Sequence, residues 1–206
     1  MRHSVNAIRA RDRGRATAGG VPAHTLVAIE AALGAFGVAP ARADEVGPAH
    51  ALAERLIGGK MADAATIAAV HARTGVGLFI VRGEEGPRGL LAFIMLNARG
   101  AGAAARDDFD ALAPNPLWVS AACEEPHAIY SWAIAAVDHE TAKQLVRGHE
   151  RLRHAAAPHL PFYCRLATPE GRRLGTMRLG FEPLPGSRSG LFWAPPRDSS
   201  LKETAA

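Results

Sequence analysis

The chain has 206 residues, of which 48% are hydrophobic, so it can bury one good core, or a core with a small appendage, and one domain is expected. The formal net charge of +4 is modest and is not concentrated in a basic stripe with interleaved aromatic residues, which excludes a nucleic-acid partner from the expectations. The longest apolar run, Leu90–Leu96, has the length of a strand, and the first twenty residues carry charges throughout, which excludes a membrane span and a secretory signal.

The two cysteines, Cys123 and Cys164, show neither CxxC nor Cys/His ligand spacing, so no disulfide framework and no metal site are expected. Both lie in apolar, strand-like contexts, which predicts two buried thiols in a reducing compartment. The chain is therefore predicted to be cytoplasmic. Its abundant Ala and its excess of Arg over Lys are typical of a GC-rich, bacterial genome.

The N-terminal third is predicted to consist of a tail and helices. Residues 1–22 contain many arginines and few apolar side chains, which is typical of a flexible basic tail, with a nucleic-acid or membrane contact as the alternative interpretation. In residues 23–74, apolar spacing and capping residues predict the helices Thr25–Phe36, Pro48–Ile57 and Asp63–Arg73.

Residues 75–194 are predicted to form the core domain, which begins with a hairpin. Val76–Val81 and Leu90–Asn97 have the composition of strands and flank a glycine-bounded loop at 82–89. Residues 98–115 are predicted to be a long loop, and Leu117–Val119 a short strand.

A strand, helix and strand pattern follows. His127–Ala136 and Phe162–Ala167 are rich in aromatic and branched residues, and Glu140–Ala156 between them has one apolar stripe. A connection of this length predicts that the two strands are parallel neighbours. Thr168 and Pro169 then begin a short helix that ends at Gly180 and Phe181, a final hairpin joins Leu184 to Leu191–Trp193, and 195–206 is predicted to be a C-terminal tail.

The second half of the chain resembles the GCN5-related N-acetyltransferase (GNAT) superfamily. The resemblance lies in Trp132–Val137, Glu140–Leu152, Phe162–Ala167 and Arg172–Pro183, and it covers roughly residues 76–194. It implies an α/β (α+β) fold with a mixed, mostly antiparallel twisted sheet, one splayed parallel strand pair, and helices on both faces.

The resemblance further implies acetyl-CoA or another acyl-CoA as cofactor, bound where the parallel strands part. The positions that correspond to the cofactor site are Ala135, Ala136, Val137, His139, Thr141, Ala142, Arg172 and Arg173. The loop at 137–144 departs from the family pattern because it lacks glycine and places Asp138 and Glu140 where a pyrophosphate would lie. Either the acyl donor binds differently, with Arg172, Arg173 or His139 supplying positive charge, or the site has lost CoA.

Acyl transfer to an amine needs a proton acceptor and a proton donor. The candidates near the two parallel strands are Glu125, His127, Tyr130 and Tyr163. Each also has a purely structural interpretation, as a solvated turn, a surface histidine or a buried tyrosine.

The resemblance implies an acyl-CoA-dependent N-acyltransferase that acts on an amine of a small molecule or protein by direct attack. The alternative is a catalytically inactive GNAT-fold protein that binds a ligand or partner. A homodimer formed through the apolar stripe of Thr25–Phe36 is a third possibility.

Overall fold

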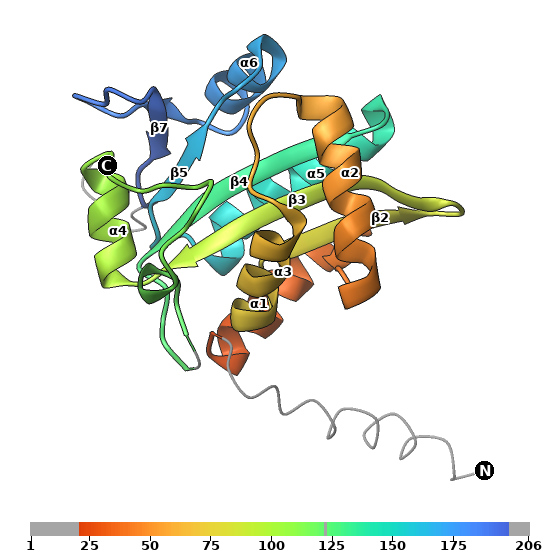
Figure 1. Ribbon diagram of the computed structural model, residues 1–206, viewed down its shortest axis with the longest axis horizontal. Helices are drawn as coiled ribbons and strands as arrows, with labels where there is room; N and C mark the ends of the chain where they lie inside the picture. The colour runs from red at the N-terminus through yellow and green to blue at the C-terminus, as the bar shows by residue number, and fades with distance from the viewer. Residues whose placement is uncertain (1–20, 122, 198–206) are drawn as a thin grey trace, which may run out of the picture.

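A computed structural model of the protein describes residues 21–121 and 123–197, and it contains one sheet of seven strands in the order β1-β2-β3-β4-β5-β7-β6 (Figure 1). The strands are β1 (Ala39–Pro40), β2 (Leu78–Gly83), β3 (Gly86–Leu96), β4 (Ala128–Ala136), β5 (Phe162–Arg165), β6 (Glu182–Pro183) and β7 (Leu191–Ala194). All neighbours pair antiparallel except β4 and β5, which are parallel. The predicted parallel pair is confirmed.

Helices cover both faces of the sheet (Figure 1). One face carries α1 (Ala23–Gly34), α5 (His139–Arg151) and the π-helix η4 (Leu152–Ala156); the other carries α2 (Val46–Ile57), α3 (Ala64–Thr74) and α4 (Ala98–Ala105). Helix α6 (Pro169–Met177) follows β5, and short 3₁₀ helices lie at Ala43–Glu45 and Pro116–Trp118. This is the mixed, mostly antiparallel α/β fold that the sequence predicted.

Several helix starts follow from single side chains. The carboxylate of Asp63 accepts a hydrogen bond from the Thr66 N–H, and Thr168 caps α6 through the Gly171 N–H. Gly75 ends α3 in the left-handed conformation. These signals are local, so the sequence contained them.

The N-terminal helix is part of the main core. Ile29 and Leu33 of α1 are buried in the same cluster as Leu145 of α5 and Leu152 of η4. The apolar stripe of α1, which suggested a contact with a second copy, is therefore covered by the chain itself.

Three local predictions are wrong. The hairpin loop is short, because β3 begins at Gly86 and its first residues pair with the end of β2. Residues 98–105 form α4, since the side chain of Asn97 accepts hydrogen bonds from the N–H groups of Arg99 and Gly100. Residues 116–118 form a 3₁₀ turn capped by Asn115, and Val119 makes one isolated bridge to Leu96.

Cys164 is buried as predicted, but Cys123 is exposed and has a φ of 58° in the left-handed region. The prediction of two buried thiols is wrong for Cys123, because it lies in a turn before β4. Residues 1–20 of the predicted basic tail and 198–206 of the C-terminal tail lie outside the described residues, while Val21 is buried. In the described part of the chain, no helix combines the length and the apolar character that crossing a membrane requires.

Candidate functional site

Strands β4 and β5 part beyond Ser131. Their pairing spans three residue pairs and ends where Ser131 lies opposite Cys164. Strand β4 then continues to Ala136, whereas β5 ends at Arg165. The last five residues of β4 therefore have no β5 partner, and an open gap replaces the sheet at this point.

A bulge in β4 falls at the same place. Phe93 of β3 pairs with Ser131 and the preceding Ala92 pairs with Ala133, so Trp132 is an extra residue in β4. A bulge bends its strand and increases the local twist. The parting of the strands thus coincides with a bend built into β4.

A cavity of about 750 Å³ occupies the gap. Its lining includes residues 131–136 of β4 and residues 164–168, which span the end of β5 and the segment after it. Parts of α2, the loop at 58–62, α5 and α6 complete it. Ala49 and Ala53 of α2 lie on one face of the sheet, and Ala142 and Val146 of α5 lie on the other. The cavity therefore reaches both faces by passing between β4 and β5.

Charged side chains stand at the exposed rim of this mainly apolar cavity. Lys60 and Arg165 are cationic, whereas Asp110 and Glu170 are anionic. The loop that carries Asp110 is fixed to the sheet because the indole N–H of Trp132 donates to the Ala111 carbonyl over 2.9 Å. Apolar walls with a few charged groups are typical of a small-molecule site.

The start of α5 carries its own anion. The carboxylate of Asp138 accepts hydrogen bonds from the N–H and the hydroxyl of Thr141, at 2.9 and 3.1 Å, and from Arg88 at 2.6 Å. The hydrogen bond from Arg88, followed by that from the Thr141 N–H, lowers the pKa of Asp138 to about 2. Asp138 is thus ionised at neutral pH and occupies part of the helix N-terminus.

The structure places the predicted cofactor residues in three groups. Ala135, Ala136 and Ala142 line the cavity. None of Val137, His139 and Thr141 belongs to the lining. Val137 and His139 are exposed to solvent, and Thr141 is buried in the helix cap. Arg172 and Arg173 are exposed on α6, which lines the cavity through Glu170, Gly171, Leu174 and Gly175 instead.

The two tyrosines differ in their relation to the cavity. Tyr130 is only 2% exposed, lines the cavity, and packs its ring 5.2 Å from that of Phe109. Burial raises the pKa of both Tyr130 and Tyr163, so both hydroxyls stay protonated at neutral pH. Tyr163 is buried but is not part of the cavity lining.

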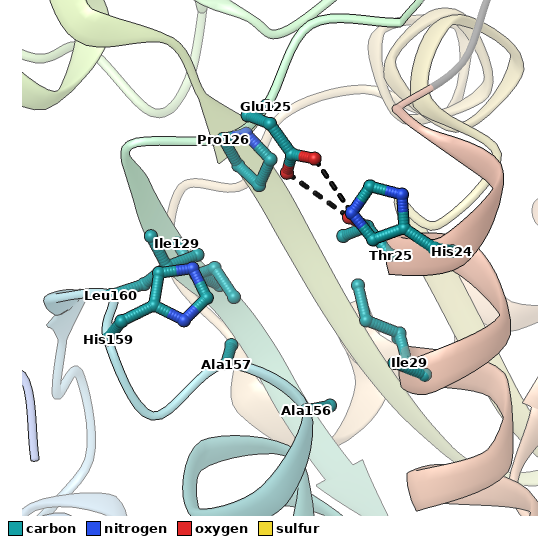
Figure 2. Close-up of a pocket in the computed structure, with 11 residues that line it drawn as sticks. His24, Thr25, Ile29, Glu125, Pro126, Ile129, Ala156, Ala157, His159 and Leu160 are labelled. Atoms are coloured by element: carbon teal, nitrogen blue, oxygen red, sulfur yellow. Dashed lines mark hydrogen bonds and ion pairs between the residues drawn. The ribbon is translucent and has the colours of Figure 1, made fainter. Parts of the chain in front are cut away.

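Glu125 and His127 lie at the opposite end of β4. Glu125 belongs to a separate pocket of about 230 Å³, where Figure 2 shows its carboxylate directed at His24 and Thr25 of α1. The contacts are 2.8 Å to His24 Nε2 and 3.2 Å from the Thr25 hydroxyl. His127 is exposed and lines neither pocket. The structure therefore does not bring these two residues together with Tyr130 at the gap.

A buried pair at the gap was missed by the sequence reasoning. The hydroxyl of Ser131 lies 2.9 Å from Nε2 of His149, which is completely buried on α5. His149 is four residues after Leu145 and three before Leu152, the two residues that define the apolar stripe of this helix. This spacing was the available signal for a histidine that faces the sheet.

Within the described ranges, no three His, Cys, Asp or Glu side chains converge as metal ligands. No family model and no curated protein sequence match the chain. Two solved structures are similar to it. The GphF GNAT-like decarboxylase in complex with isobutyryl-CoA is 14% identical over 68% of this chain and 70% of its own, with a TM-score of 0.45.

The other is the histone acetyltransferase HPA2 and related acetyltransferase from Corynebacterium glutamicum, which is 16% identical over 79% of this chain and 97% of its own, with a TM-score of 0.46. Such low identities and TM-scores transfer no activity. In the described residues, the strand order, the one parallel pair, β4 with β5, and the gap at which that pair opens define the fold as GNAT-like. The resemblance noted in the sequence is thereby confirmed for the fold.

Proposed function

We propose that the protein binds an acyl-CoA thioester in the gap between β4 and β5 and transfers its acyl group to an amine by direct attack. The acceptor is an amine of a small molecule or protein. The observation that supports this most directly is the cavity, which passes through the sheet where the parallel strands part. Its volume of about 750 Å³ lies within the range of roughly 300–1,000 Å³ that is usual for small-molecule sites.

The gap suits the pantetheine arm of CoA, which is narrow and carries amide groups. Residues 132–136 of β4 have lost their β5 partner, so the edge that faces the gap offers backbone groups to an extended ligand, as an added strand would use them. The small side chains of Ala133, Ala135 and Ala136 line the gap and leave room for the ligand. An amide-bearing chain can therefore replace the missing stretch of β5.

The phosphates of CoA would lie near the start of α5, where Asp138 opposes them. Arg88 is the compensating charge, because its guanidinium is held beside this helix start by the same carboxylate. A bound pyrophosphate would compete with Asp138 for Arg88. This competition predicts that CoA binds weakly. The positive charge of Arg88 is what allows the glycine-free loop to accept CoA at all.

Tyr130 is the proposed proton donor to the departing thiolate, since it lines the cavity and stays protonated. Glu125 and His127 have no role in this step, because they lie at the other end of β4. The second candidate function is a catalytically silent protein that binds a ligand in the same cavity. It is favoured by the carboxylate of Asp138 at the helix start.

Calorimetric titration of the full chain with acetyl-CoA tests the proposal. We expect saturable binding that Ala136→Trp weakens by at least tenfold, because Ala136 lines the cavity and an indole would fill it. Asp138→Asn should strengthen binding about two- to fivefold, which corresponds to the roughly 0.3–1 kcal/mol of one charge at a helix terminus. Asn retains the capping acceptor, so the helix start survives this change.

The matched control is Ala101→Trp, which places the same side chain at a half-buried alanine of α4 away from the cavity. It should bind acetyl-CoA as the native chain does. Absence of binding at millimolar acetyl-CoA in the native chain would refute the proposal. Release of free thiol from acetyl-CoA in the presence of amines then separates the transferase from the silent protein.

A further inference from the structure

His149 is an unusual group to bury beside the proposed site. It is fully inaccessible, and its ring lies 5.9 Å from that of Phe93, 5.6 Å from that of Phe162 and 6.0 Å from that of Phe181. Among the described residues, its Nδ1 has no hydrogen-bond partner, whereas Nε2 lies 2.9 Å from the Ser131 hydroxyl. A polar ring in an apolar core therefore makes one hydrogen bond, and it makes it to Ser131.

The orphaned Nδ1 determines the direction of that hydrogen bond. A buried N–H without an acceptor is rarer and more costly than a buried acceptor without a donor. We therefore assign the proton of the neutral ring to Nε2, which donates it to the Ser131 oxygen. The hydroxyl hydrogen of Ser131 is then not used by His149, and it can rotate toward another acceptor.

Ser131 stands where the cavity meets the intact sheet. It is the last residue of β4 that pairs with β5, it precedes the bulge at Trp132, and it lines the cavity. A pantetheine arm that runs along residues 132–136 from the start of α5 would bring its thioester to this inner end. The donor freed by His149 thus lies where the acyl group would end.

We propose that the Ser131 hydroxyl donates a hydrogen bond to the thioester carbonyl oxygen of the bound acyl-CoA and that His149 is the positioning residue that holds it. This inference rests on the proposed function. In the transfer, the amine nitrogen forms the new C–N bond and the C–S bond breaks. The thiolate takes its proton from Tyr130, and the proton lost by the amine restores the Tyr130 hydroxyl. Ser131 keeps its proton throughout and stabilises the negative charge that develops on the carbonyl oxygen.

Comparison of acetyl-CoA with CoA in the native chain and in a Ser131 variant tests this contact, because CoA lacks the acetyl group and with it the thioester carbonyl. We expect Ser131→Ala to remove the affinity advantage of acetyl-CoA over CoA, a loss of up to about tenfold for one hydrogen bond, while CoA itself still binds. Ser131→Thr retains the hydroxyl and should restore the advantage. His149→Gln retains a donor and should preserve more of it than His149→Phe.

Infrared difference spectroscopy of ¹³C-carbonyl acetyl-CoA gives a second readout. The native chain should lower the carbonyl stretching frequency, and Ser131→Ala should return it toward the value in water-free solvent. If CoA and acetyl-CoA both bind but Ser131→Ala changes neither their affinity ratio nor the frequency, the inference is overturned and the proposed function stands. If neither ligand binds the native chain, the proposed function itself fails and this inference fails with it.

Discussion

His149 shows how one buried side chain connects the stability of this protein to pH. Burial, with a smaller contribution from the nearby charge of Arg153, lowers the pKa of His149 to about 3. In the unfolded chain the imidazole has its ordinary pKa of about 6.5. Below pH 6.5 the unfolded state therefore binds a proton that the folded state does not, and stability falls as the pH falls toward 3.

This difference predicts a measurable loss between pH 7.5 and pH 5.5. The free energy of unfolding of the native chain should decrease by about 1 kcal/mol because of His149 alone, since each pH unit below 6.5 costs up to about 1.4 kcal/mol. His149→Gln has no titrating ring at this position. Urea denaturation of both chains at the two pH values should show that the stability advantage of the native chain is smaller at pH 5.5.

Arg153 is the described charged group that acts on His149, and it stays positive over this range. The other histidines are common to both chains, so their contributions cancel in the difference. An advantage that stays constant between the two pH values would show that the ring is exposed to solvent or paired with an acid.

At the level of elements, α4 depends on one close contact. Gly100 is buried against the 3₁₀ turn at 116–118, and a Cβ built on it would lie 2.3 Å from the Trp118 carbonyl oxygen. The obstacle is backbone, so either the helix or the turn must move. The absence of a side chain at Gly100 is therefore what lets α4 pack here.

Gly100→Ala should accordingly lower the free energy of unfolding by about 1–3 kcal/mol, the usual cost of overpacking. Gly102→Ala in the same helix is the control. Its Cβ would meet only the end of the Arg106 side chain at 3.4 Å, so the variant should be neutral or gain up to about 1 kcal/mol from helix propensity. Equal effects of the two changes in chemical denaturation would contradict the packing described for α4.

The same helix shows why some elements could not be predicted from the sequence. Two glycines in eight residues offset the helix propensity of the alanines in α4, and the contact with Trp118 is not local. The caps at Asp63, Asp138 and Thr168 involve neighbours in the chain, and their positions followed from the sequence. The cap of α4 at Asn97 is also local, but the glycines at 100 and 102 masked it, and the packing against Trp118 could not be predicted from the sequence.

At the scale of the whole molecule, the parallel pair was predictable because a long crossover with a helix leaves few other topologies. The gap was expected from the family resemblance, but the bulge at Trp132 and the extent of the cavity depend on registers that no sequence pattern states. Glu125 lies just before β4, away from the gap. Its distance from the site follows from topology, because the strands part at their carboxyl ends.

The central claim is that a CoA thioester enters the sheet between β4 and β5. Hydrogen–deuterium exchange of the full chain, with and without saturating acetyl-CoA, tests it most directly. We predict slower exchange of the backbone amides in 132–136 and 165–168, and no change around Glu125 and His159 at the other end of β4. Protection confined to that second pocket, or unchanged exchange at the gap with ligand bound, would contradict the account.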